Sequence, residues 1–295
     1  MTSKLIVNSI RHTGASAAAI TMDASGNVTF PANATCSGTA TGFGVGIGAS
    51  ETQGYQNLKI NTTANNSTSV SCDSVILENS SGTLIRVNNV SVTLDATTTG
   101  ANGLDTGSLA TQKAYHVYII SNGSTTASLA SLSSTSPTLP SGYTYKARVG
   151  SIGTTMIDSN LLKLIQINDN SFLQDQNNDQ TTTRVKIGSG QVGDEAFDLH
   201  YVPSTAASWH LCVQTYGATT AGTTHTWKIG GKSGGNNYTT HFQIYHVTAN
   251  GVGDLKYRYM DIPILEYTSG TPKAYVTTNT NTGPNWRINC IGWRF

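Results

Sequence analysis

Charged side chains are scarce in this sequence. Lys and Arg number 17 and Asp and Glu 16 among 295 residues, which is 11% and leaves a net charge of +1. Ordinary globular proteins have about 25% charged residues. The clusters of Lys and Arg that neutralise phosphates are absent, so we expect no nucleic-acid partner. Thr, Ser and Asn take the place of charge, with 44, 30 and 24 copies, and such a surface suits β-sheets that pack against copies of themselves.

Long apolar runs are also missing. No stretch approaches the roughly 18 apolar residues that a transmembrane helix needs. The first eight residues lack the apolar core and the cleavage site of a secretion signal. We therefore expect a protein that is made and folded in a cytoplasm and does not insert into a membrane.

Cysteines are few and far apart. They stand at Cys36, Cys72, Cys212 and Cys290, and no pair has the C-x-x-C spacing of a zinc or redox site. A chain of this length does not need a disulfide framework. We interpret the four residues as buried, reduced thiols that act as small apolar side chains.

What the sequence does contain is the alternation of β-branched and aromatic residues that is typical of strands. Turn signals rich in Gly, Asn and Ser separate these segments, and the spacing predicts an all-β fold built of β-sandwich domains. One short, weak helix is expected near residues 160–166. The expected strands are 4–11, 69–77, 115–121, 144–150, 209–216, 239–247, 256–262 and 286–295.

Composition divides the chain into five parts. Residues 1–41 hold too little apolar material for a core of their own, and the Gly-rich stretch 42–49 has the composition of a flexible joint. Residues 50–167 alternate strands with turns, as one β-sandwich would. The polar stretch 168–183 is interpreted as a linker. Residues 184–295 carry all four Trp, eight of the 13 Tyr and three of the six Phe, and form a C-terminal β-sandwich that is the candidate receptor-binding domain.

Two motifs imitate cofactor sites. Residues 44–49 match G-x-G-x-x-G/A, but a polar, Gly-containing segment follows them in place of the helix that a dinucleotide needs. Residues 175–179 begin like a calcium loop, but Gln180 replaces the required Gly and Lys186 the bidentate Glu. We therefore expect no cofactor.

Catalytic and metal-binding residues are equally hard to assemble. Asp194, Glu195 and Asp198 lie near His200 and are the best candidates for acid–base chemistry, but solvated carboxylates are ordinary in a turn that enters a strand. No H-x-H pair occurs, so no single strand can chelate a metal. Three copies of one His around a symmetry axis remain an alternative. We expect neither a catalytic nor a metal site, and no enzyme.

Three segments resemble known proteins. Residues 3–10, SKLIVNSI, followed by residues 19–30, AITMDASGNVTF, resemble the start of tail-fibre and related virion proteins of tailed bacteriophages, notably marine and cyanobacterial ones. Residues 75–150 are similar to a β module that recurs in phage structural proteins. The resemblance implies a homotrimeric fibre, assembled in the host cytoplasm and located in the virion. It implies attachment to another phage particle protein, such as a tail adaptor, through Leu5, Ile6, Val7 and Ile10.

The resemblance also implies contact between the C-terminal domain and a host surface polysaccharide or protein. Two Gly-rich loops flank the expected strand 224–229, and loops on a rigid sheet commonly carry binding function. Aromatic faces and amide groups suit sugar rings. The candidate receptor-binding residues are His225, Trp227, Asn236, Asn237 and Tyr238.

Two other functions stay open at this point. A head-decoration or other purely structural virion protein would share the same modules without a receptor. A depolymerase acting on surface polysaccharide is the third possibility, although acidic residues are scarce. Location of the protein on the tail or on the capsid would separate the first two.

Overall fold

The structure is a computed structural model, and contacts within it divide the chain into two units, residues 1–50 and 51–295. Side chains are described for residues 54–155, 158–173, 202–212, 259–264 and 290–295. The backbone is also described for residues 9–10, 20–22, 28–29, 184–185, 193–198, 213–216, 224–232, 238–247, 255–258, 267–268, 271–278 and 286–289.

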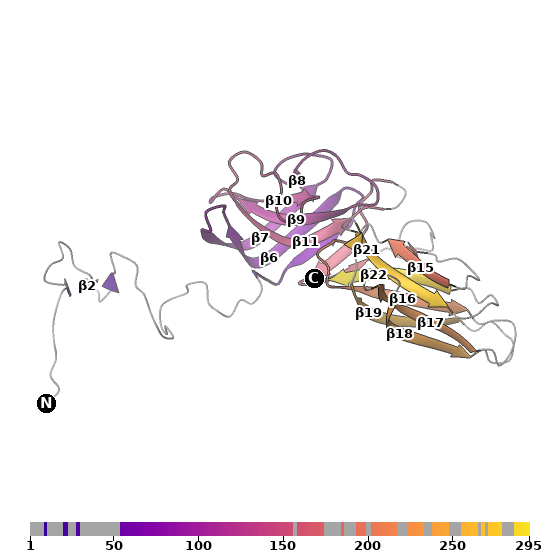
Figure 1. Cartoon of the computed structure of the whole chain (residues 1–295). Helices are drawn as coiled ribbons and strands as arrows, with labels where there is room; N and C mark the ends of the chain where they lie inside the picture. Colours follow the sequence, from indigo (N-terminus) through magenta and orange to yellow (C-terminus); the bar gives the residue numbers. More distant parts are fainter. Residues whose placement is uncertain are drawn as a thin grey trace, which may run out of the picture. The chain divides into compact units, whose positions relative to one another are not determined.

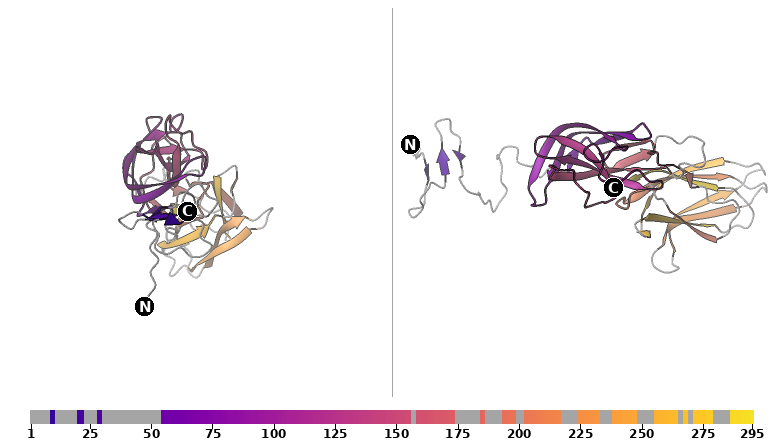
Figure 2. Two further views of the ribbon diagram at one scale, coloured as in Figure 1. Left: turned by 90° about the vertical axis from the view of Figure 1, so that its left-hand side faces the viewer. Right: turned by 90° about the horizontal axis from the view of Figure 1, so that it is seen from above.

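The first unit contains three short strands in one antiparallel sheet, drawn as small indigo arrows in Figure 2. Ile10 pairs with Ile20, so one of the four expected attachment residues lies in a strand. Leu5, Ile6 and Val7 lie outside the described residues. The strands are β1 (Ser9–Ile10), β2 (Ile20–Met22) and β3 (Val28–Thr29).

Every regular element of the second unit that the structure describes is a β-strand, so the fold is all-β (Figure 1). A 14-stranded mixed sheet dominates it, and among its described strands the parallel pair is β8 with β10. Its first strands are β4 (Tyr55–Gln56), β5 (Lys59–Thr62), β6 (Ser67–Glu78), β7 (Leu84–Asp95), β8 (Gly103–Leu104), β9 (Ala114–Ser121), β10 (Thr126–Ser131), β11 (Tyr145–Gly153), β12 (Leu164–Ile167) and β13 (Asn170–Leu173).

The rest of the chain completes this sheet and adds a five-stranded one, in the order β15-β21-β17-β18 with β20 beside β21. Among the described residues, no helix has the length and apolar character that crossing a membrane requires. The strands are β14 (Arg184–Val185), β15 (Gly193–Asp198), β16 (Ser208–Tyr216), β17 (Thr224–Lys232), β18 (Tyr238–Val247), β19 (Leu255–Pro263), β20 (Tyr267–Thr268), β21 (Thr271–Thr278) and β22 (Trp286–Arg294).

Most strands expected from alternation are present, and two local expectations are wrong. The helix expected over 160–166 is absent: Leu162, Leu164 and Gln166 are buried in alternation with Lys163 and Ile165, which is the period of a strand. The expected linker 168–183 begins inside a hairpin, because its first six residues form a turn and strand β13. Residues 174–183 lie outside the described residues.

Strand β9 is buried on both faces, which fixes its place in the fold. Val117 and Ile119 enter the main core together with side chains of β6 and β7. Tyr118 and Ile120 point the other way and form a small second core with Leu129. Loop 132–144, which joins β10 to β11, packs on this second core through its partly buried side chains. The sequence of a strand that is buried on both faces is a nearly continuous run of apolar residues, as in β9.

The main sheet continues from the first half of the unit into the second without interruption. Its path runs β6-β5-β12-β13-β22-β16-β19, and the seam is the antiparallel pair β13–β22, where Ser171 faces Trp293. Trp293 and its cross-strand neighbour Trp209 are fully buried in the same core as Ile60 of β5. One core therefore underlies all these strands.

Candidate functional site

The sheet face that points away from this core carries the candidate site, and we call it the outer face. Its strands are in register, so one line of residues crosses six of them. The order along the line is Asn61, Ile165, Phe172, Gly292, His210 and Asp261. Residues up to 120 positions apart in sequence, Phe172 and Gly292, are thereby paired directly in this line.

Gly292 lies between the two rings of this line and allows them to meet. Phe172 on β13 and His210 on β16 are two strands apart, a separation of roughly 9–10 Å between backbones. Their ring centroids are nevertheless 5.3 Å apart and the planes differ by 8°. The rings lean toward each other over the glycine, which has no side chain to keep them apart. Phe172 remains 42% exposed, whereas His210 is buried beneath it.

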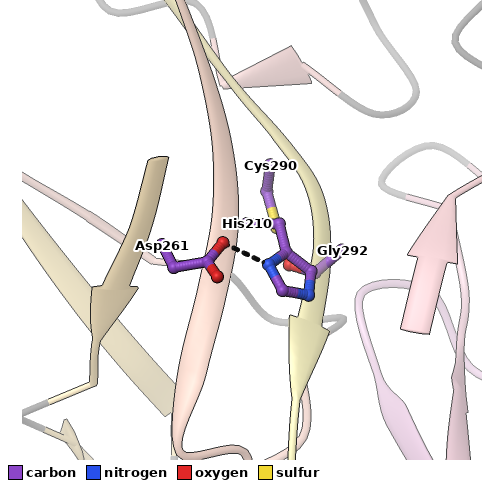
Figure 3. A network of polar contacts seen from close by, with 4 residues as sticks. All are labelled: His210, Asp261, Cys290 and Gly292. Carbon is purple, nitrogen blue, oxygen red and sulfur yellow. Dashed lines mark hydrogen bonds and ion pairs between the residues drawn. The ribbon is translucent and has the colours of Figure 1, made fainter. Parts of the chain in front are cut away.

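The imidazole of His210 holds the neighbouring carboxylate in place (Figure 3). Nδ1 of His210 lies 2.5 Å from Oδ1 of Asp261, and because an ionised carboxylate can only accept, Nδ1 is the donor. Nε2 of His210 is buried without a hydrogen-bond partner, so it does not face a solvent-borne molecule. Asp261 is 63% exposed. The pair therefore presents an oriented carboxylate at the surface.

Exposed apolar side chains lie on the same sheet face as this carboxylate. The described residues include five large hydrophobic side chains that are exposed, and three of them, Ile167, Phe172 and Tyr259, are on the outer face. Tyr259, 71% exposed, is two residues from Asp261 on β19 and points to the same side of the sheet. We call Ile167, Phe172, Asp261 and Tyr259 the outer-face patch. An exposed apolar group of this kind beside a fixed charge is typical of a binding surface.

Four other titratable side chains of the described residues, His116 and three cysteines, are buried. Burial, with the nearby Arg148 guanidinium, lowers the pKa of His116 to about 4. Burial raises the pKa of the Cys72 thiol to about 11, and Cys212 and Cys290 are also buried thiols. Among the described residues, no group of three His, Cys, Asp or Glu side chains is arranged to hold a metal ion.

The receptor-binding residues expected from the sequence do not form one cluster. His225 and Trp227 lie on β17, and Tyr238 begins β18, where it pairs with Lys232. Because Lys232 is seven residues beyond His225, that His and Tyr238 lie roughly 23 Å apart along the hairpin. Asn236 and Asn237 lie outside the described residues, and the role of all five stays a prediction.

The acidic cluster expected near a turn lies on a regular strand instead. Asp194, Glu195 and Asp198 belong to β15, paired along its length with β21, and His200 lies outside the described residues. The motifs at 44–49 and 175–179 are also outside them. The outer-face patch was missed because its members come from three strands, β12, β13 and β19, and only cross-strand register joins the first two to the third.

Comparison with known proteins gives one match. Residues 67–153 match the family model described as "Mtd second domain". The match spans β6 to β11, less than a third of the chain, and therefore assigns a module and not a family for the whole protein. No curated protein matches the chain.

This match bears on the expectation that the protein is not an enzyme. The expectation that the protein is not an enzyme finds no support in this match. It is withdrawn here. The words "Mtd second domain" specify no reaction, so no activity is transferred to this chain either.

Proposed function

We propose that the chain is a virion protein of a tailed bacteriophage, a tail fibre or receptor-binding protein. It attaches to the particle through its N-terminal segment and contacts the host cell surface with its C-terminal half. The observation that carries the binding part of this proposal is the outer-face patch, where Phe172 and Tyr259 are exposed on the same sheet face as the oriented Asp261 carboxylate. Exposed aromatic surface is unfavourable in water and gains free energy when a partner covers it.

The module structure supports the virion part of the proposal. The family match at 67–153 covers nearly the same stretch, 75–150, that resembles a recurring phage module. In this stretch β6 and β7 share a core with β9 and β10, as the two sheets of a β-sandwich do. We infer that the fibre is built of such sandwiches, and the low charge of the chain suits their packing around an axis.

The patch predicts a specific loss of adsorption. Replacing Phe172 and Tyr259 together by Ser should lower binding of the labelled protein to host cells at least about tenfold, because aromatic anchors dominate binding energy at interfaces. Both side chains are exposed, so the fold should be retained. Cell-bound fluorescence as a function of protein concentration measures the change.

The matched control is Leu132→Ser, which removes another exposed large apolar side chain, 56% exposed, that is not on the outer-face strands. It should leave adsorption unchanged. Equal adsorption by the double variant and the original protein would move the receptor site elsewhere. A further variant with Asn236, Asn237 and Tyr238 replaced by Ala then tests the loop that the sequence singled out.

The fibre proposal also predicts a trimer. Analytical ultracentrifugation of the full chain should give three times the monomer mass of 31.1 kDa at micromolar concentration.

Removing residues 1–41 should leave a folded body that no longer joins the particle, since Leu5, Ile6, Val7 and Ile10 are then missing. A 31.1 kDa species at that concentration, or normal assembly of the truncated protein, would contradict the proposal.

A head-decoration protein is the second candidate, because the resemblance of residues 75–150 to a phage module does not distinguish the tail from the capsid. Immunogold labelling of intact particles distinguishes them. Label on the tail supports the fibre proposal, and label over the capsid supports decoration.

A further inference from the structure

Two adjoining hollows lie beside loop 132–144. Their volumes are about 420 and 520 Å³, and both are lined by Glu78 and Lys146. Small-molecule sites fall in the range of about 300–1,000 Å³, so each hollow has room for a ligand. We call the two together the Lys146 groove.

The wall formed by loop 132–144 is held in place by bonds at several points. The hydroxyl of Tyr118 donates to the carbonyl of Ser133 at 2.8 Å. Oδ2 of Asp105 accepts from the backbone N–H of Thr138 at 3.1 Å and from the hydroxyl of Ser131 at 2.6 Å. A groove with fixed walls loses little entropy when a ligand binds.

Two cations of β11 line the groove and retain unused hydrogen-bond donors. Nζ of Lys146 donates to the carbonyl of Thr135 at 2.6 Å, and Nη1 of Arg148 donates to that of Ser134 at 3.2 Å. These acceptors are backbone carbonyls, which carry no charge and so do not neutralise the two cations. Since an ammonium has three donors and a guanidinium five, both side chains can make further hydrogen bonds. Within the described residues neither cation has a carboxylate in ion-pair distance, although Glu78 lines the same groove. The groove therefore carries two positive charges, Lys146 and Arg148, against the single negative charge of Glu78, which pairs with Lys146 across the strands.

The remaining lining combines hydroxyl and amide groups with apolar surface. Leu84, 46% exposed, lines the hollow that contains Arg148, and Tyr143 lines the other. Asn79, Ser80 and Thr144 add polar groups. A sugar ring has the complementary chemistry, since it carries several hydroxyl groups and one apolar face.

We propose that the Lys146 groove binds an acidic sugar unit of a glycan. Its carboxylate lies against Lys146 and Arg148, its ring covers Leu84, and the next sugar unit reaches Tyr143. Charge-assisted hydrogen bonds to a carboxylate are the strong contacts of such a site. The site is separate from the outer-face patch, and it goes beyond the proposed function because it does not depend on host-cell adsorption.

Isothermal titration calorimetry of the full chain tests this with free oligosaccharides. The probes are tetragalacturonate, tetramannuronate and disialic acid, with methyl-esterified tetragalacturonate as the uncharged match. At least one acidic probe should bind, and the ester should bind at least about tenfold more weakly. Salt at about 1 M should lower the affinity of the acidic probe, because the Debye length then falls to about 3 Å. No binding by any acidic probe, or equal binding by the ester, would overturn the proposal.

Variants locate the site. Lys146→Gln with Arg148→Gln should weaken the acidic probe at least about tenfold, whereas Lys113→Gln, which removes an exposed charge outside the groove, should not. Glu78→Gln should strengthen binding about two- to fivefold, because it removes a negative charge that repels the carboxylate of the sugar and leaves Lys146 and Arg148 in place. Unchanged affinity in both the double variant and Glu78→Gln would show that the glycan binds elsewhere. If the protein binds the acidic probe in calorimetry but does not adsorb to host cells, the proposed function is rejected and the glycan site is retained.

Discussion

Gly292→Ala should destabilise the second unit by more than about 3 kcal/mol, one of the two largest effects that we expect. An added Cβ would lie 1.9 Å from the carbonyl oxygen of Ser171 and 3.1 Å from Cδ2 of His210. The first obstacle is backbone of the paired strand β13, which cannot turn aside as a flexible side chain can. Strands β13 and β22 would have to separate, and the Phe172–His210 stack would open.

Urea denaturation followed by tryptophan fluorescence measures this loss, because Trp293 lies at the seam opposite Ser171. The matched control is Gly54→Ala, where an added Cβ meets nothing within 4 Å. That variant should change the free energy of unfolding by less than about 1 kcal/mol. Equal stability of the two variants would show that β13 and β22 are not paired as described.

The second large effect is a loss of stability in mild acid. Because burial and the Arg148 charge lower the pKa of His116 to about 4 from the ordinary 6.5, the unfolded chain binds this proton more readily than the folded one. Stability is therefore fully present above about pH 6.5 and decreases as the pH falls toward 4. The difference of the two pKa values corresponds to roughly 3 kcal/mol in the free energy of unfolding.

Denaturation curves at pH 7, 5.5 and 4 provide the measurement. His116→Gln, which cannot gain a proton, should lose most of this pH dependence even if it is less stable at pH 7. Hydrogen bonds from Thr97 and Thr155 lower the pKa values of Asp95 and Asp158 from the ordinary 3.8, so these two carboxylates titrate at more acidic pH than this window. A pH profile that His116→Gln leaves unchanged would contradict the assignment.

Local pattern located several strands well. Alternation located β6, β16, β18, β19 and β22 to within a residue or two of their ends. It failed at β12, because three apolar residues, Leu161, Leu162 and Leu164, suggested a helical turn although they belong to a strand and its approach. The linker expected from Asn168 failed for a related reason. Asn168 is polar because it makes a tight turn with positive φ and bonds to Leu58, not because the chain is solvated there.

The candidate sites could not be found from sequence for a different reason. Phe172, His210 and Asp261 are ordinary residues of three strands, and only the pairing of β13 with β22 and of β22 with β16 brings them together. Lys146 and Arg148 were likewise visible as two scattered charges. They lie together at the groove because backbone carbonyls of the 132–144 loop accept hydrogen bonds from both side chains. Both sites depend on register and loop closure, which composition does not encode.

The central position of β22 has a consequence for synthesis on the ribosome. This strand is the last of the sequence, yet it lies between β13 and β16, so neither neighbour can complete its hydrogen bonds until residue 294 has emerged. Chains are made at about 5–20 residues per second, and the edge of β13 thus waits several seconds for its partner. During that time the nascent chain exposes an open strand edge, which other chains on the same polysome can pair with. Because β22 pairs with β13 so late, we expect a high yield of folded protein only when nascent chains are kept apart, either by low expression or by a chaperone bound to the open edge.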